Sequence, residues 1–188
     1  MRISLFDEVF GRLGNRMFQS AFLYAYAKKH GLNWYYQDPK WFEGYEEEIK
    51  QLFGDGIGFL PYVSIHVRRG DYANNPFYVD LAQTDYYLRA LDHFPNKNFL
   101  VFSDNTEFCK NFFLFKGKNF QIMENQTEIE DFNQMASCEG NIISNSSFSW
   151  WAAYLNPNPA RKVVAPSVEN WHTDGIERTV CPLEWIRI

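Results

Sequence analysis

From Pro61 to the end of the chain, short apolar runs alternate with segments of helical spacing. The apolar runs are rich in β-branched and aromatic residues and predict strands at residues 62–67, 98–103, 119–123, 141–144 and, as the last strand, 162–165. The segments between them predict helices at residues 84–94, 105–115, 128–138 and 147–155. Strands and helices in this order are typical of a parallel, doubly wound α/β sheet.

The preceding residues have a less regular pattern. They predict a strand at residues 2–6, a helix at 16–30, a second strand at 33–37 and a short acidic helix at 45–53. A glycine-rich stretch before residue 59 has the composition of a linker. We therefore expect two lobes, residues 1–59 and residues 60–188, with the parallel sheet in the second lobe.

Charge and cysteine content exclude several classes of protein. The 188 residues carry a formal net charge of −5, whereas a general nucleic-acid-binding protein normally has a basic face. Three widely spaced cysteines form neither a disulfide framework nor a metal-binding cluster. The first residues lack the apolar region of a signal peptide, and no apolar run reaches the length of a membrane span. This composition predicts a soluble, cytoplasmic protein that binds no nucleic acid and does not cross a membrane.

The strand at residues 62–67 ends abruptly in a charged loop, Arg68-Arg69-Gly70-Asp71. Parallel sheets bind ligands at the carboxyl ends of their strands. Two adjacent arginines at such an end, on an acidic chain, therefore predict a seat for phosphate or carboxylate. The alternative is a pair of surface arginines whose charges are balanced by Asp71 and a second acid.

Polar residues also follow two other predicted strands, at Phe102-Ser103-Asp104 and at residues 144–148. Because the carboxyl ends of parallel strands lie on one edge of the sheet, we expect all three segments to converge on one ligand. The serine cluster at 144–148 opens a helix whose free amides and hydroxyls suit a diphosphate, although ordinary N-capping needs only one of these serines. Asp104 either accepts hydrogen bonds from the ring nitrogens of guanine or caps its helix together with Glu107.

Two further features, His66 and the first glycine loop, each allow two interpretations. His66 lies within the strand, where it either reaches a ligand or is a hydrogen-bonded core histidine. Gly11-x-x-Gly14 after a short strand is typical of an anion-binding loop, but it also suits an ordinary turn in which Asn15 caps the next helix. The sequence contains neither an acidic Asp-x-Asp pair nor a His/Cys ligand spacing, so we expect no metal cofactor.

Three motifs together resemble the α-1,2-fucosyltransferases of glycosyltransferase family 11, and they occur in the family's order. They are Gly11-Arg12-Leu13-Gly14-Asn15-Arg16-Met17-Phe18-Gln19, His66-Val67-Arg68-Arg69-Gly70-Asp71-Tyr72 and Ser144-Asn145-Ser146-Ser147-Phe148-Ser149-Trp150-Trp151. Phe102-Ser103-Asp104 fits a fourth family position. The likeness covers the first 30 residues and nearly everything from residue 61 to the end.

This resemblance implies a fold and a set of site residues. The fold would be a GT-B-like variant with a Rossmann-type donor lobe and a reduced N-terminal lobe, because the family's usual length is missing between about residues 38 and 60. Arg68 and Asn15 would be catalytic, with Arg68 on the diphosphate and Asn15 closing over the donor from the other lobe. His66 and Asp104 would hold guanine. The donor-binding set implied is Gly14, Asn15, His66, Arg68, Arg69, Asp71, Asp104, Ser144, Asn145, Ser146, Ser147 and Phe148.

The resemblance also implies an activity. The chain would be an inverting, metal-independent glycosyltransferase that moves L-fucose from GDP-β-L-fucose to the 2-hydroxyl of a galactose-containing oligosaccharide. Asp7, Glu8 and Asp71 are candidates for the general base. Two other functions remain open: a GDP-sugar-binding protein without transfer activity, and a nucleotide-binding regulatory module unrelated to sugars.

Overall fold

The computed structural model describes residues 13–31, 53–54, 56–174 and 181–188. The chain divides into two units, Met1–Gly56 and Ile57–Ile188, which we describe separately. The predicted strands at 2–6 and 33–37, and nearly all of the predicted helix at 45–53, lie outside the described residues. The assignment of residues 1–59 to a reduced, acceptor-side lobe stays a prediction.

The described part of the first unit is mainly helix α1, Leu13–His30, which Gly31 ends with a positive φ of 63°. Its buried residues are Gly14, Met17, Phe18, Ala21, Ala25 and Ala27. The helix includes Leu13 and therefore begins earlier than the predicted start at residue 16. Asn15 consequently lies within the first turn, and the interpretation of Asn15 as the helix cap is wrong.

The second unit contains a six-stranded parallel sheet, which confirms the predicted α/β class. Its strands are β1 (Leu60–Val67), β2 (Phe99–Ser103), β3 (Phe120–Ile122), β4 (Cys138–Ile142), β5 (Lys162–Ala165) and β6 (Ile186–Arg187). Their order across the sheet is β3-β2-β1-β4-β5-β6, and every pairing is parallel. Within this unit, the first strand, β1, is central. The next two strands extend the sheet to β3 at one edge, and the chain then crosses to β4 on the other side of β1. Ligands bind open α/β sheets at this point of reversal, here between β1 and β4.

Two strands differ from the prediction. Strand β6 follows the strand that was predicted to be the last. The sequence did not predict it, because a strand of two residues is too short to give an apolar pattern. Strand β4 begins at Cys138 and ends at Ile142, whereas the sequence predicted 141–144. Its polar residue Asn141 is buried, and its amide donates to Ser64 Oγ (2.7 Å) and to the carbonyl of Met135 (2.7 Å). A buried amide with these partners is compatible with a strand interior.

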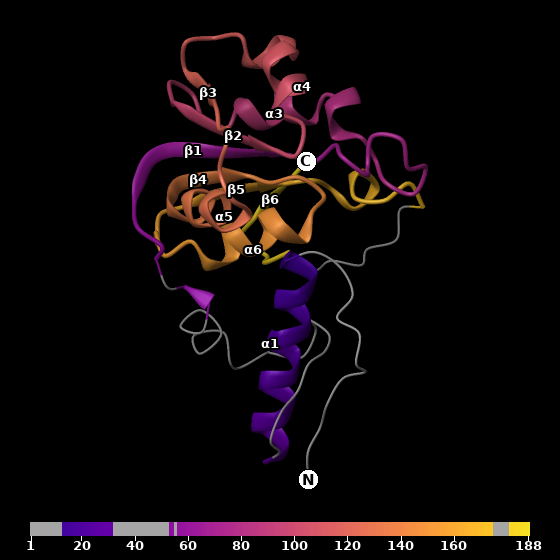
Figure 1. Cartoon of the computed structure of the whole chain (residues 1–188), viewed down its shortest axis with the longest axis vertical. Helices are drawn as coiled ribbons and strands as arrows, with labels where there is room; N and C mark the ends of the chain where they lie inside the picture. The colour runs from indigo at the N-terminus through magenta and orange to yellow at the C-terminus, as the bar shows by residue number, and fades with distance from the viewer. Residues whose placement is uncertain (1–12, 32–52, 55, 175–180) are drawn as a thin grey trace. The chain divides into compact units, whose positions relative to one another are not determined.

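Four helices flank the sheet, α3 and α4 on one face and α5 and α6 on the other (Figure 1). They are α3 (Tyr86–Leu91), α4 (Thr106–Asn111), α5 (Glu128–Ser137) and α6 (Ser147–Leu155). Short 3-10 turns lie at η2 (Leu81–Gln83), η3 (Phe113–Phe115) and η4 (Val168–Asn170). The predicted helices 84–94 and 105–115 are shorter than expected. Pro95 follows the first of them, and Phe112 is extended in the second.

Alternate residues of β1 face opposite sides of the sheet. Val63, Ile65 and Val67 pack into a core that includes Tyr86 and Tyr87 of α3. The hydroxyl of Tyr87 donates to the carbonyl of His66 (2.9 Å), which fixes the end of β1.

The hydroxyl of Tyr86 lies within hydrogen-bond distance of two carbonyls, Ile143 O (2.6 Å) and Val164 O (3.1 Å). Helix α3 is therefore tied to the carboxyl ends of β4 and β5, on one side of the point of reversal. Within the described ranges, no helix combines the length and the hydropathy that a membrane span requires.

Candidate functional site

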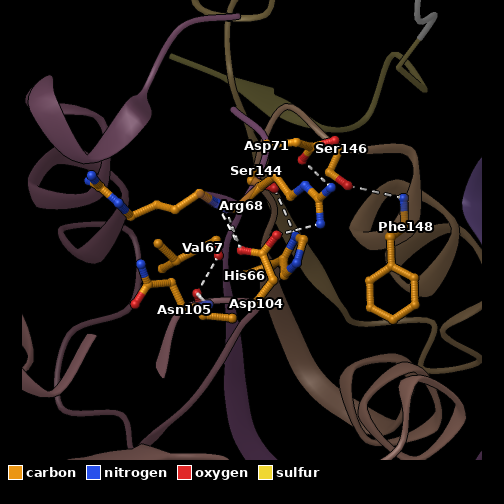
Figure 2. Close-up of polar contacts among 12 residues, drawn as sticks. His66, Val67, Arg68, Asp71, Asp104, Asn105, Ser144, Ser146 and Phe148 are labelled. Carbon is orange, nitrogen blue, oxygen red and sulfur yellow. Dashed lines mark hydrogen bonds and ion pairs between the residues drawn. The ribbon is translucent and has the colours of Figure 1, made fainter. Parts of the chain in front are cut away.

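Three polar segments meet at the carboxyl edge of the sheet, as predicted, because β2, β1 and β4 are neighbours. Ser103 Oγ donates to the carbonyl of Val67 (2.7 Å), which joins the ends of β2 and β1. Ser144 Oγ lies 2.8 Å from His66 Nδ1, which joins β1 to the segment after β4. Figure 2 shows His66, Ser144 and Asp104 gathered around Arg68.

Arg68 lies between two carboxylates. Its guanidinium forms ion pairs with Asp71 and with Asp104 (Figure 2), and it lies 5.1 Å from the ring centre of Tyr72. The Arg68 side chain is only 10% exposed, whereas Asp71 is 65% exposed and Asp104 18%. The ion pairs named in the alternative are present, but Arg68 is not an exposed surface residue, and its role as a seat for phosphate or carboxylate stays a prediction.

Arg69 has different neighbours. Its guanidinium forms an ion pair with Asp80 (3.0 Å) and lies 3.7 Å from the ring centre of Phe108. Both charged side chains are 15% exposed. The backbone N–H of Arg69 donates to Asp104 (2.9 Å). The side chain of Arg69 is therefore engaged by its own chain, and its predicted part in donor binding stays a prediction.

Asp104 is bound to the loop that carries Arg68. One of its oxygens, Oδ1, accepts hydrogen bonds from the amides of Arg69 (2.9 Å) and Gly70 (3.0 Å), and Oδ2 pairs with Arg68. Burial by itself raises the pKa of this carboxyl, but the two amides and the Arg68 charge hold the pKa below its ordinary value. Helix α4 is capped by Asn105, whose Oδ1 accepts from the amide of Phe108 (3.0 Å). The interpretation of Asp104 as a cap is wrong.

His66 is buried on the face of β1 that also carries Ser64. The centre of its ring lies 5.6 Å from that of Phe148, the second residue of α6. The interpretation of His66 as a hydrogen-bonded core histidine is supported by the contact between Nδ1 and Ser144. The same ring also borders the carboxyl edge, next to an aromatic side chain that is half-buried.

The polar residues of the segment 144–148 make different hydrogen bonds. Ser146 is the N-cap of α6 and accepts from the amide of Phe148 (3.4 Å), so the capping interpretation is confirmed for this serine. The amide of Ser144 donates to Ser149 Oγ (3.2 Å). Asn145 is buried and donates to the carbonyls of Val79 (2.9 Å) and Trp171 (3.1 Å). Asn145 thus fixes the loops that border the site.

Three of the predicted site residues remain to be placed: Gly14, Asn15 and Ser147. Gly14 and Asn15 lie in the other unit, on α1, so their role in a shared site stays a prediction. Ser147 is the first residue of α6 and is half-buried. Among the described residues there is no group of three His, Cys, Asp or Glu side chains that could hold a metal ion.

The sequence did not identify several residues that build the site. Ser103 and Ser149 were within recognised motifs, but only their hydrogen bonds distinguish them from the neighbouring serines. Nothing in the sequence indicated that Asp80 pairs with Arg69, because Asp80 lies eleven positions later in an irregular loop. Gly70 was part of the motif without a role. A Cβ at Gly70 would lie 2.5 Å from Asp104 Oδ2, so the contact between the loop and Asp104 requires a glycine.

Comparison with known proteins decides the family. The sequence profile of Glycosyl transferase family 11 matches residues 7–188, nearly the whole chain. The chain belongs to glycosyl transferase family 11. The family resemblance drawn from the three motifs is thereby confirmed.

Three curated relatives show what this family 11 chain is similar to. It is 28% identical over 176 residues to an Escherichia coli protein named alpha-1,2-colitosyltransferase, with 82% of the chain and 61% of that protein covered. It is 30% identical over 134 residues to the Escherichia coli O-antigen biosynthesis glycosyltransferase WbnK, with 66% and 44% covered. It is 32% identical over 104 residues to galactoside alpha-(1,2)-fucosyltransferase 1 of Saimiri sciureus, with 50% and 28% covered. The chain therefore spans only part of the length of these relatives.

Proposed function

We propose that this family 11 chain is an inverting, metal-independent glycosyltransferase that moves L-fucose from GDP-β-L-fucose to the 2-hydroxyl of a galactoside, giving an α-1,2 linkage. The family and the printed names of the relatives support sugar transfer and the α-1,2 linkage. The observation that carries the proposal is Arg68, a nearly buried guanidinium beside the point of reversal of a parallel sheet. A planar cation in this position suits a diphosphate.

The Arg68 site supplies charge stabilisation during departure of GDP. The bond from the fucose anomeric carbon to the β-phosphate oxygen breaks, and its electron pair stays on that oxygen. Arg68 and the amides at the start of α6, near Ser146 and Ser147, then face the growing negative charge. Because this charge is larger in the transition state than in the donor, the interaction raises the rate and not only the affinity.

The acceptor hydroxyl attacks the anomeric carbon from the opposite face and loses its proton. This side of the reaction involves the general base, and Asp71 is the described candidate because it is exposed next to Arg68. Asp7 and Glu8, the other candidates, lie outside the described residues. We assign Asn15 and the first unit to the acceptor side and to closure over the donor.

His66 and Phe148 form the proposed border of the guanine site. They come from different elements, β1 and the start of α6, and their rings are adjacent. A heteroaromatic base can stack on an aromatic ring, and a neutral imidazole offers one donor or acceptor to it.

The experiment is transfer with GDP-fucose in the presence and absence of lactose, followed through GDP release and the linkage of the product by NMR. A second donor arm uses GDP-colitose, because one relative is named as a colitosyltransferase. We expect GDP release that depends on lactose and an α-1,2-linked product. Arg89→Ala is a matched control, because Arg89 is an exposed arginine of α3 paired with Asp85 at 3.8 Å.

Three outcomes separate the candidate functions. A product with another linkage contradicts the proposed regiochemistry. Tight GDP-fucose binding without transfer supports the alternative, a GDP-sugar-binding protein. A chain that binds neither donor contradicts both functions.

A further inference from the structure

The carboxylate of Asp104 is already occupied by the chain itself. Oδ1 accepts two backbone hydrogen bonds from successive residues, Arg69 (2.9 Å) and Gly70 (3.0 Å). Oδ2 pairs with the Arg68 guanidinium. Three consecutive residues of one loop thus converge on one side chain from another strand. A bidentate contact to guanine needs a free lone pair on each oxygen, and Oδ1 has used both of its acceptor positions.

Gly70 makes this contact possible. Its missing side chain leaves the space that Asp104 fills, since a Cβ at this position would lie 2.5 Å from Oδ2 and 3.1 Å from Cγ. The φ of Gly70 is not in the left-handed region. The glycine is therefore required by the close approach of the carboxylate and not by the backbone conformation.

Asp104 is itself held firmly on both sides. Ser103 Oγ donates to the carbonyl of Val67 (2.7 Å) and accepts from the amide of Asn105 (3.0 Å). Asn105 caps α4 through the amide of Phe108 (3.0 Å). The carboxylate thus projects from a fixed point at the end of β2 and can impose its position on the neighbouring loop.

We infer that Asp104 is a positioning residue that clamps the Arg68–Gly70 loop, so that the Arg68 guanidinium is pre-aligned for a diphosphate, and that it does not read the base. The diphosphate in this inference rests on the proposed function. The clamp itself does not depend on it. The resemblance implied guanine recognition by Asp104, and the two roles predict different changes in ligand selectivity.

The test is calorimetric titration of the full chain and its variants with GDP, ADP and pyrophosphate. For Asp104→Ala we expect the affinities for all three ligands to fall by a common factor of about tenfold or more, with the GDP-to-ADP ratio unchanged. Asp104→Asn keeps an oxygen for the two amides but loses the charge opposite Arg68, so its affinities should lie between those of wild type and Asp104→Ala. Thr127→Ala is the matched control: it removes the cap of another helix, α5, and should leave all three affinities unchanged.

Gly70→Ala tests the clamp from the other side. Its added methyl group displaces the carboxylate, so the variant should reproduce the common loss of affinity. The combination with Asp104→Ala should cost little more than Asp104→Ala alone, because both changes remove the same contact.

Amide hydrogen exchange tests the clamp without any ligand. Exchange of the Arg69 and Gly70 amides should accelerate about tenfold or more in Asp104→Ala, should change much less in Asp104→Asn, and should be unchanged in Thr127→Ala. Slow exchange in the strands of each variant shows that the sheet is folded. Should transfer be detected, the kcat of Asp104→Asn should fall by a larger factor than its KM rises, since a misaligned Arg68 loses mainly transition-state contact.

Each contrary result is distinct. A selective loss of GDP affinity, with pyrophosphate binding unchanged, overturns the inference in favour of base recognition. A rise in all three affinities also overturns it, because Asp104 would then only compete with phosphate for Arg68. Unchanged exchange at Arg69 and Gly70 overturns the clamp. A wild-type chain that binds none of the three ligands contradicts the proposed function, and the exchange measurement still decides the clamp.

Discussion

Arg68 and Arg69 are adjacent in the sequence, yet they belong to two different regions of the molecule. The Arg68 region lies at the carboxyl edge and includes the highly exposed Asp71. The Arg69 region consists of Asp80 and the ring of Phe108, and both charged groups there are largely buried. In the first region a carboxylate partner is accessible to exchange with a ligand, and in the second it is not. The proposed difference between a ligand seat at Arg68 and a structural ion pair at Arg69 therefore lies in the accessibility of the counter-ion, and not in the arginine itself.

The largest expected effect comes from Arg68→Ala. It should lower turnover by at least about 100-fold at saturating donor, which corresponds to about 2.7 kcal/mol of transition-state stabilisation. Arg68→Lys should restore little activity, because a point charge lacks the planar fork of the guanidinium. Steady-state kinetics with both variants measure this effect. Near wild-type turnover of Arg68→Ala would remove the basis for placing the diphosphate in this region.

Arg69→Ala should act on stability instead. It leaves Asp80 largely buried without its cation and removes the contact with Phe108, so we expect the free energy of unfolding to fall by about 2 kcal/mol. Turnover of the folded fraction should fall by less than about tenfold. Urea denaturation measures the first quantity, with Arg89→Ala as the exposed-arginine control, for which we expect at most about 0.5 kcal/mol. If Arg69→Ala is stable but inactive, Arg69 belongs to the ligand-binding region instead.

Asp71→Asn should have a smaller effect, in the opposite direction. It removes an exposed carboxylate that competes with phosphate for Arg68, so the affinity for pyrophosphate should rise by about two- to fivefold at low ionic strength. The gain should shrink as salt is added, because salt screens the charge that is removed. Titration at two ionic strengths measures both changes. A fall in affinity would instead indicate that Asp71 contacts the donor directly, as the family resemblance implies.

Treatment with EDTA should have the smallest effect on turnover, namely none. If Arg68 supplies the positive charge opposite the diphosphate, no divalent cation is needed for that purpose. The assay compares initial rates before and after chelation and after addition of Mg²⁺ or Mn²⁺. Activity that is lost on chelation and restored by either cation would assign the counter-charge to a metal.

The sequence predicted those parts of the fold whose signals are local. Helix α6 (Ser147–Leu155) and strand β5 (Lys162–Ala165) have the predicted bounds, since a capping serine opens the helix and β-branched residues fill the strand. The start of strand β4 was missed because Glu139 and Gly140 are poor strand formers, and they join the sheet by pairing with β1. A partner that lies more than 70 positions away leaves no trace in a local pattern.

The same limit explains what was missed at the site. The convergence of the strand ends follows from parallel topology alone and could be predicted. The different environments of Arg68 and Arg69 could not be predicted, because they depend on Asp104 and Asp80, which only the fold brings near the two arginines. In the interpretation of the sequence, Asp104 was considered as the cap of α4 and Asn105 was not, although both residue types cap well. The fold decides between them, because Asn105 accepts from the amide of Phe108 while Asp104 is held by the amides of Arg69 and Gly70.

The hydroxyl of Tyr86 also has a consequence for how the site assembles during folding. Its two acceptors, Ile143 and Val164, lie 57 and 78 positions further along the chain. An emerging polypeptide can form α3 early, but it cannot complete this junction until β5 has been synthesised and docked beside β4. Contacts of such long sequence separation form late and slowly. The carboxyl edge that holds Arg68 therefore matures only after the residues of β5 have left the ribosome.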